Sequence, residues 1–571
     1  MEAQTRMTCL SRIGFVVVLA LTGAALPRPA VAGPDVWILK SMKTELERNR
    51  TGLRLEGYEP AYFISYTVRD GDRYYISGKS GALFASTHLP SRFAQVDVHV
   101  GDYDMDSSED SEAFFNTNQK FVPNSIAPLD ASESALRQVM WLLTDYRYKA
   151  ALMSFLKVKA KRVNDPKART VNSMAKADPV KLEETVPSLK FDQKRWEQGV
   201  RRISATFLDL PEIFDSSVEA AAVRQTRYFV NTEGTAVSTT DTYYQIFVTA
   251  FTRAEDGLLL QDAVTFYGRS PDDIPAPEDV EKATRVMAVR LVKMRSAAML
   301  EPATVPVLMS PEATGVFFHE TVGHRLEGQR QDDEEEGRTF KGHVGQKVLP
   351  DFLQMYDDPT QARAVNVPLN GYYRVDDEGV AAKRAVLVEN GVLKNFLMSR
   401  RPIEGFSQSN GHARGDGFQR PVGRMANLFV EGKTPVSHDR LEAMLLEEVR
   451  KQGKPYGLII ETIAGGSTNT SSYGFQAFKG LPKVAWRVDA TTGEKTLVRG
   501  FEIVGTPLSA LNKIVATSDR YGVFNGYCGA ESGSVPVSTV APEMLFAEIE
   551  LQRAEEGKER APILPPPFGA R

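Results

Sequence analysis

Cysteine is scarce in this chain of 571 residues, which contains only two, Cys9 and Cys528. Cys9 lies in an apolar N-terminal segment with the features of a cleaved signal. Loss of that segment leaves Cys528 alone and excludes a disulfide within the chain. A single thiol in an oxidising compartment is a liability unless it is buried or bound. Cys528 is therefore expected to be either a buried small hydrophobe or a metal ligand.

Long apolar runs are also missing after residue 32. Residues 1–32 predict a secretory signal peptide, because Arg6 and Arg12 precede an apolar run at 13–26 and a small-residue cleavage site follows at 30–32. The run is shorter than a typical membrane span, although an uncleaved anchor is the alternative. We expect an exported protein, periplasmic or secreted, with no stable membrane span after the signal is removed.

A strong excess of one charge is lacking as well. The formal net charge is −4, and removal of the signal, which carries three arginines and one glutamate, takes it to −6. Nothing in this balance indicates nucleic-acid binding. A hydrophobic content of 42% and a charged content of 25% are ordinary for globular proteins. The length allows two or more domains.

The pattern of apolar residues predicts an α+β fold. We expect an N-terminal α/β domain at 33–300, a strand-rich C-terminal domain at 301–555 and a Pro-rich flexible tail at 556–571. Asp70-Gly71-Asp72 predicts a turn after the first strand. The N-terminal helices are expected at 36–53, 132–161, 193–207 and 277–300, and its clearest strands at 62–68, 225–231 and 236–240.

One stretch, residues 310–328, predicts a helix with a metal site on it. Ser310 is a good N-cap, Pro311 suits the first helical position, and Gly328 is a plausible C-terminal stop. Inside lies the pattern His319-Glu320-x-x-x-His324. This short pattern also occurs by chance, and a histidine in an apolar helix is commonly a satisfied core or surface group.

The spacing of the two histidines is unusual for one metal site. Residues five apart on a regular helix are separated by about 140° of rotation, against about 40° for residues four apart. Two imidazoles at such an angle do not converge on one ion. We therefore predict a bulge, a broken turn or a helix end between His319 and His324. Gly323 is suited to such a distortion.

Two histidines make an incomplete protein site, because a catalytic zinc usually has three protein ligands and a water. The residues alone leave three candidates for the third ligand, namely Glu327, His343 and Cys528. A glycine-rich segment at 410–417 carries His412 and Arg414, and its composition favours a flexible loop that contacts substrate over an ordinary surface loop. It lacks the strand–loop–helix context of a phosphate-binding loop.

The chain resembles the TldD/PmbA family of metalloproteases, also called modulators of DNA gyrase, and specifically its TldD side. The resemblance covers about residues 225–550. It is carried by His319-Glu320-x-x-x-His324, Leu326-Glu327-Gly328, Gly342-x-Val344-Gly345, Asp376-Asp377-Glu378-Gly379-Val380, Glu389-Asn390-Gly391-x-Leu393-Lys394, Asn410-Gly411, Arg424-Met425-x-Asn427, Gly465-Gly466-x-Thr468-Asn469, Cys528-Gly529 and Val535-Pro536-Val537.

The resemblance implies one zinc ion held by His319, His324 and Cys528, which would make the C-terminal domain a metalloprotease domain carrying the metal-binding helix. It leaves Glu327 and His343 as residues next to the ligands. PmbA-like partner chains lack the metal motif, whereas this chain has it. The resemblance therefore disfavours the hypothesis that this chain is an inert partner. The signal peptide departs from the family, whose typical members are cytoplasmic.

The implied activity is zinc-dependent hydrolysis of peptide bonds in unfolded or extended polypeptides. Glu320 would be the general base on a metal-bound water. Substrate would add a strand at an edge near Gly465 and Gly466. The remaining expected substrate-binding residues are His343, His412, Arg414 and Tyr473.

The expected partners are the substrate and a second family chain, in a homodimer or a heterodimer. The alternative function is a peptide-binding or assembly protein with a structural zinc, which a fourth ligand such as His343 or Glu327 would favour. A non-proteolytic zinc hydrolase is a third reading, for which no dedicated sequence feature is present.

Overall fold

The computed structural model of the chain describes residues 36–110, 122–164, 171–333, 336, 338–468, 470–471, 478–505, 507–554, 559–560, 562–564 and 567. The predicted signal peptide and Tyr473 lie outside the described residues, as does much of the predicted tail. The four-part division of the chain stays a prediction.

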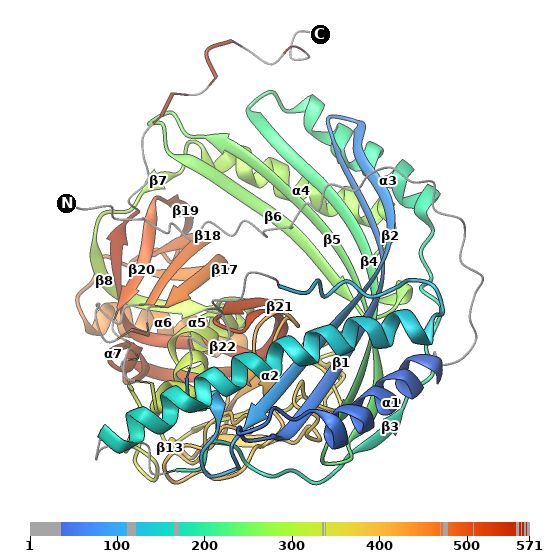
Figure 1. The fold of residues 1–571 in the computed structure, drawn as a ribbon. Coiled ribbons are helices and arrows are strands. Elements are labelled where there is room, and N and C mark those ends of the chain that lie inside the picture. The colour runs from blue at the N-terminus through green and yellow to red at the C-terminus, as the bar shows by residue number, and fades with distance from the viewer. Residues whose placement is uncertain are drawn as a thin grey trace, which may run out of the picture.

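The N-terminal half is built on a curved sheet of long strands (Figure 1). Within the described residues this sheet has six strands in the order β2-β1-β4-β5-β3, with β6 paired to β5. All its pairings are antiparallel except β3 with β5. Its strands are β1 Ala61–Lys79, β2 Ala82–Val100, β3 Lys181–Glu183, β4 Ile213–Asn231, β5 Ala236–Arg253 and β6 Leu259–Gly268.

Four helices cover one face of this sheet. Ile64, Tyr66 and Ile76 of β1 are buried and share a face, because side chains alternate along a strand. Ile64 and Tyr66 pack with α1 and α2, whereas Ile76 packs with α3 and α4. The helices are α1 Val36–Gly52, α2 Glu133–Asn164, α3 Gln193–Ala205 and α4 Pro277–Met294.

The C-terminal half is a second sheet between two helices, α5 Pro311–Thr321 and α6 His438–Lys451. Met544 and Phe546 of β22 pack in the core that contains α5, and Leu545 between them packs with α6. Twelve strands of the described chain form this sheet, in the order β13-β12-β9-β16-β22-β8-β17-β18-β19-β7, with β20 paired to β18 and β22, and β21 paired to β22.

The strand bounds of this sheet are β7 Ala298–Met299, β8 Ala303–Met309, β9 Leu353–Asp357, β12 Ala385–Glu389, β13 Val392–Leu393, β16 Asn427–Gly432, β17 Tyr456–Thr468, β18 Phe478–Asp489, β19 Lys495–Arg499, β20 Phe501–Gly505, β21 Ile514–Ala530 and β22 Gly533–Arg553. Two short ribbons, β10 Arg363–Ala364 with β11 Val367–Pro368 and β14 Ala413–Arg414 with β15 Val422–Gly423, and a short helix, α7 Pro507–Leu511, complete this half.

The two halves meet on the face of the N-terminal sheet that the helices leave free. Arg227 of β4 donates to Asp377 at 2.6 Å and to the carbonyl of Val375 at 2.7 Å. Arg69 of β1 donates to the same carboxylate at 3.1 Å. Phe229 packs against Val375. The turn at Asp376–Gly379 is thus a buried, charge-paired joint between the halves.

The mixed α+β class is confirmed, and the first three predicted helices match α1, α2 and α3 within a few residues. The predicted turn at Asp70-Gly71-Asp72 is wrong, because β1 runs through it. Asp70 is buried and accepts from Arg92 of β2 at 2.9 Å, so its charge is satisfied within the sheet. The chain turns instead at Ser80 and Gly81, which have φ of 47° and 79°, as a two-residue hairpin turn requires.

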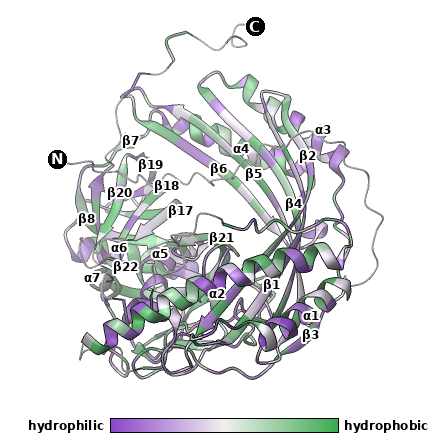
Figure 2. Cartoon of the chain, viewed as in Figure 1, coloured by the Kyte–Doolittle hydropathy of each residue, from purple (hydrophilic) through white to green (hydrophobic). Residues whose placement is uncertain are grey.

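The described helices mix hydrophilic and hydrophobic residues along their lengths (Figure 2). None of those helices is both long and apolar enough to cross a bilayer.

A buried charged histidine lies at the end of β2. His99 is 6% exposed, and its two ring nitrogens lie 2.9 Å from Asp97 and 2.7 Å from Asp106. Arg420 from the C-terminal half donates to Asp97 at 3.2 Å. Burial alone would lower the pKa of His99, but the two carboxylates outweigh it and raise that pKa to about 9. The imidazolium therefore stabilises the folded chain.

We predict that His99→Gln destabilises the protein more at pH 6 than at pH 9.5. The folded-state pKa of about 9 lies above the unfolded value, so this contribution is fully present below about pH 6.5 and is lost as pH rises through 9. The loss at pH 6 should be on the order of 3 kcal/mol. Urea unfolding at both pH values measures it. His88→Gln, at a more exposed position on β2, is the control, and a pH-independent loss for His99→Gln would contradict the assignment.

Candidate metal centre

Helix α5 is anchored at its start by a capped turn. Ser310 accepts from the amide of Ala313 at 3.1 Å, and its hydroxyl donates to the carbonyl of Glu461 in β17 at 2.7 Å. Pro311 occupies the first helical position. Phe317 and Phe318 are buried in the core against the sheet. The helix axis is therefore fixed relative to β17 before it reaches His319.

The helix ends between the two histidines, as their spacing predicted. α5 stops at Thr321, Val322 is its C-cap, and a 3₁₀ helix follows at Gly323–Leu326. The predicted stop at Gly328 is wrong, because that residue begins another 3₁₀ helix, Gly328–Gln331. Gly323 serves close packing, since a Cβ there would overlap the Met425 sulfur.

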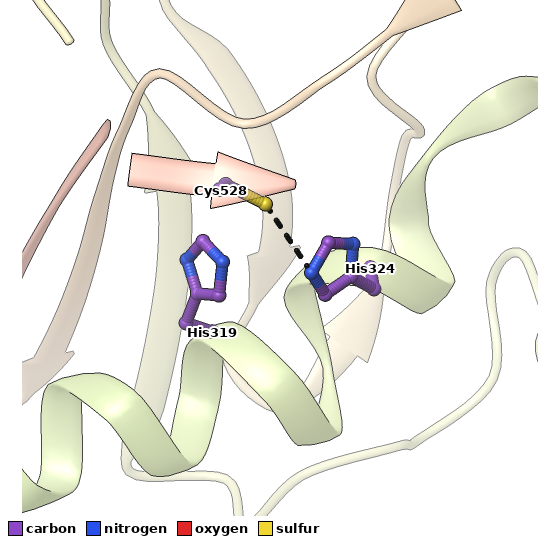
Figure 3. A group of neighbouring side chains, drawn as sticks. All are labelled: His319, His324 and Cys528. Atoms are coloured by element: carbon purple, nitrogen blue, oxygen red, sulfur yellow. Dashed lines mark hydrogen bonds between the residues drawn. The ribbon is translucent and has the colours of Figure 1, made fainter. Parts of the chain in front are cut away.

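The break brings His319 and His324 to the same place as Cys528 of β21 (Figure 3). The potential ligand atoms of the three side chains all lie within 4.8 Å of one another. Cys528 Sγ is 3.3 Å from His324 Nε2, and the two imidazole rings are 5.0 Å apart at 87°. The three residues are between 4% and 6% exposed. Cys528 approaches from a strand that lies two hundred residues further along the chain.

The donor set fits a metal ion. Zinc held tetrahedrally at its usual bond lengths separates a sulfur and a nitrogen donor by about 3.6 Å, close to the 3.3 Å between Cys528 and His324. His319 Nδ1 is buried without a hydrogen-bond partner. Two imidazoles and one thiolate suit zinc in particular. Within the described residues three protein donors meet, which leaves one position open as in a catalytic site.

The charges around the triad favour a thiolate. Burial alone would raise the pKa of Cys528, but His324, Arg424 and His319 outweigh it and hold that pKa well below its ordinary value. Burial lowers the pKa of His324, whereas Cys528 and Glu327 raise it, and the net shift is well upward. These directions favour the thiolate form of Cys528, which is the form that binds metals.

Glu327 lies on the far side of the His324 ring from the sulfur. Its side chain is fully buried, and Oε1 is 3.2 Å from His324 Nδ1, whereas Cys528 faces Nε2. A carboxylate at the outer nitrogen fixes the ring and its tautomer, as is common for metal-binding histidines. Burial raises the pKa of Glu327, but His324 and Arg330 lower it to about 2. Glu327 is therefore ionised and lies where it can hold the His324 ring in position.

Glu320 lies half-buried beside Gly466 of β17. A Cβ on Gly466 would come within 2.5 Å of Glu320 Cγ, so the glycine makes room for this side chain. Glu320 directly follows His319 on α5, at the last turn before the helix break. Gly466 of the predicted substrate edge thus lies next to the predicted general base.

The other predicted substrate residues within the described part of the chain have partners of their own. His412 is fully buried, with ring contacts to Asn410 and Asp357. Arg414 is 6% exposed and donates to the carbonyls of Met425 and Pro536. The 410–417 segment is therefore packed where a flexible loop was expected. His343 is partly exposed, and its ring contacts the carbonyl of Lys341.

Sequence reasoning missed Arg424 and Arg330, which surround Glu327. Arg424 Nε is 3.3 Å from Oε1 and Arg330 Nε is 2.7 Å from Oε2. Arg424 lay in a motif that the sequence analysis quoted, but arginine is usually exposed, so nothing in the pattern indicated a buried role.

Comparison with known proteins finds a family model that matches the part of the chain carrying the triad. Residues 302–553 match the family described as PmbA/TldA metallopeptidase C-terminal domain. A metalloprotease of Archaeoglobus fulgidus is 32% identical over 269 residues, which cover 46% of this chain and 57% of that protein. A zinc metalloprotease TldD homolog of Saccharolobus solfataricus is 24% identical over 275 residues, or 48% of this chain and 57% of that protein. The matches span little more than half of either relative.

Solved structures share the whole fold at low identity. TldE from Thermococcus kodakarensis has a TM-score of 0.58 and 15% identity, and the match covers 90% of this chain and 100% of that chain. A protein described as a modulator of a DNA gyrase from Thermotoga maritima has a TM-score of 0.56 and 16% identity, with 86% and 96% covered. Both halves of the fold therefore recur together in these proteins.

We predict that Cys528→Ser lowers zinc affinity at least about tenfold, because one of three protein ligands loses its thiolate. Metal analysis after dialysis against a weak chelator measures the occupancy. His343→Ala is the control and should keep the metal of the unaltered protein. Equal occupancy in Cys528→Ser and the unaltered protein would remove the cysteine from the site.

Proposed function

We propose that this chain, whose residues 302–553 match the PmbA/TldA metallopeptidase C-terminal domain, is a zinc-dependent peptidase. The convergence of His319, His324 and Cys528 at the end of α5 carries the proposal, because these three buried donors, the ones that meet in the described part of the chain, leave a fourth position open. The names of the relatives support a metalloprotease, and one of them is named a zinc enzyme. We propose one zinc per chain.

Glu320 is the general base of the proposed reaction. A bound zinc supplies Lewis acidity, which lowers the pKa of a water and polarises a carbonyl. Glu320, one residue along α5 from His319, takes the proton from the attacking water and returns it to the leaving amine. It lies at the helix end, half-buried beside Gly466.

The proposed substrate is an extended or unfolded polypeptide that binds along β17. β8 pairs with β17 only from Leu458 to Ile460, and β17 continues past this pairing to Thr468. Its extension runs beside α5 and passes Glu320 at Gly466. A peptide added as a strand on that side gains main-chain hydrogen bonds, which depend little on side chains. This geometry suits unfolded chains of varied sequence.

A structural zinc, the alternative function, requires a fourth protein ligand. Glu327 faces the nitrogen of His324 opposite to the sulfur, so it cannot join Cys528 on one ion without moving the ring. The ring of His343 contacts Lys341. The arrangement of the described residues therefore favours an open, catalytic site.

We further propose export to the periplasm or outside the cell, and pairing with a second family chain. Export rests on the signal pattern of residues 1–32. A metal at Cys528 would protect the one thiol left after signal cleavage. Pairing, as a homodimer or a heterodimer, rests on the family resemblance.

We predict that Glu320→Gln keeps the metal and the fold but lowers peptide hydrolysis roughly a hundredfold or more, because the general base is lost. Cleavage of an unfolded protein substrate by the purified full chain, beside metal analysis, measures both effects. Glu312→Gln, two turns earlier on α5, is the matched control and should retain activity. Unchanged hydrolysis in Glu320→Gln would move the base elsewhere, with Glu327 the next candidate.

A further inference from the structure

Arg424 lies between β15 and β16 and contacts both Cys528 and Glu327. Its side chain is fully buried. Nη2 donates to the carbonyl of Cys528 at 2.7 Å, and Nε lies 3.3 Å from Oε1 of Glu327. Glu327 faces the outer nitrogen of His324. One guanidinium thus joins the backbone of one donor residue to the carboxylate that supports another.

Cys528 needs such a contact because it lies near the tip of a hairpin. The pairing of β21 with β22 ends at Ala530 opposite Gly533, two residues after Cys528. Arg424 Nη1 donates to the Ser532 hydroxyl at 2.8 Å and to the carbonyl of Gly533 at 3.2 Å. The guanidinium therefore binds both arms of the hairpin at the point where strand pairing stops.

A second arginine, Arg330, contacts Glu327 and the hairpin turn. Arg330 Nε donates to Glu327 Oε2 at 2.7 Å, and its Nη2 donates to Glu531 at 2.8 Å. Glu531 lies in the same hairpin turn, between Ala530 and Ser532. The carboxylate of Glu327 is thus held between two arginines, and both arginines reach the hairpin that carries Cys528.

The backbone that presents Arg424 is itself fixed. Its amide donates to the carbonyl of His412 at 2.9 Å. Buried Asp357 accepts from the amides of Ala426 at 3.0 Å and Asn427 at 3.1 Å. Met425 fills the space left by the missing side chain of Gly323, next to His324. The segment 424–427 therefore packs against the helix break and holds Cys528.

We propose that Arg424 is a positioning residue that sets the distance between Cys528 and His324 before a metal ion binds. This inference rests on the proposed function, since it assumes that the triad binds metal. The planar guanidinium matters as much as its charge, because it contacts Glu327, the Cys528 carbonyl and the hairpin turn at once. A lysine ammonium at this place carries the charge but cannot span these partners.

The test compares Arg424→Lys and Arg424→Met with the unaltered full-length chain. Cobalt(II) is the probe, because a thiolate bound to cobalt gives a charge-transfer absorption that reports the metal–sulfur bond directly. We expect both variants to bind zinc roughly ten- to a hundredfold more weakly in a chelator competition, the usual cost of losing a residue that orients metal ligands. We also expect the cobalt–thiolate absorption to weaken or shift in both variants.

Arg92→Met is the matched control. Arg92 is likewise fully buried, and it binds Asp70 and the carbonyls of Pro128 and Leu129 in the N-terminal half. Its loss should lower thermal stability and leave zinc affinity and the cobalt spectrum unchanged. If the Arg424 variants do not fold, Ser532→Ala removes one contact of the guanidinium and should reduce affinity in the same direction.

The outcomes separate this inference from the proposed function. Zinc affinity and cobalt absorption equal to the unaltered protein in Arg424→Lys would show that charge alone suffices and would overturn the positioning role. In Ser532→Ala, zinc affinity and cobalt absorption equal to those of the unaltered protein would also overturn the positioning role. An unaltered protein that binds neither zinc nor cobalt would overturn the proposed function and this inference with it.

Discussion

The site depends on where α5 stops. A regular helix would carry His319 and His324 to directions about 140° apart, and no rearrangement of the side chains alone brings both rings to one ion. The end of the α-helix at Thr321 and the tighter turn from Gly323 remove this conflict. Close packing of Met425 on Gly323 then keeps the chain in the broken form. Backbone geometry, set by packing, therefore precedes any contribution of the metal.

The second constraint is that the site buries several charges. Their burial opposes the packing around the helix break unless every charge is paired. The thiol, an imidazole, a carboxylate and two guanidinium groups lie together with little or no exposure. Removing one partner from a buried pair typically costs about 3–5 kcal/mol, because the other charge is left without compensation. The alternation of Arg424, Glu327 and Arg330 meets this requirement by ion pairs and backbone carbonyls. Such a network fixes geometry because few other arrangements satisfy all of its members.

The sequence predicted local features where one physical rule dominated. The histidine spacing forced a helix break, and Ser310 with Pro311 marked the helix start that α5 has. The turn expected at Asp70-Gly71-Asp72 failed because tertiary pairing with Arg92 overrode a local turn signal.

The residues alone left Glu327, His343 and Cys528 open as the third donor, since a contact across two hundred residues has no local signature. The buried arginines were missed because arginine is usually exposed. His412 and Arg414 proved to be packed where glycine-rich sequence suggested a loop.

The shared fold and the site carry different parts of the functional argument. Solved structures near 15% identity reproduce both halves of the architecture, so the fold by itself is compatible with chains that differ at most positions. A fold can host unrelated activities, and function must be read from the chemistry of specific side chains. In this chain that chemistry is concentrated where α5 ends, β21 turns back and β17 runs past β8. Three segments far apart in the sequence supply the three donors, the proposed base and the proposed edge for substrate. Their supports, Arg424 and Gly466 among them, are therefore as informative about function as the donors themselves.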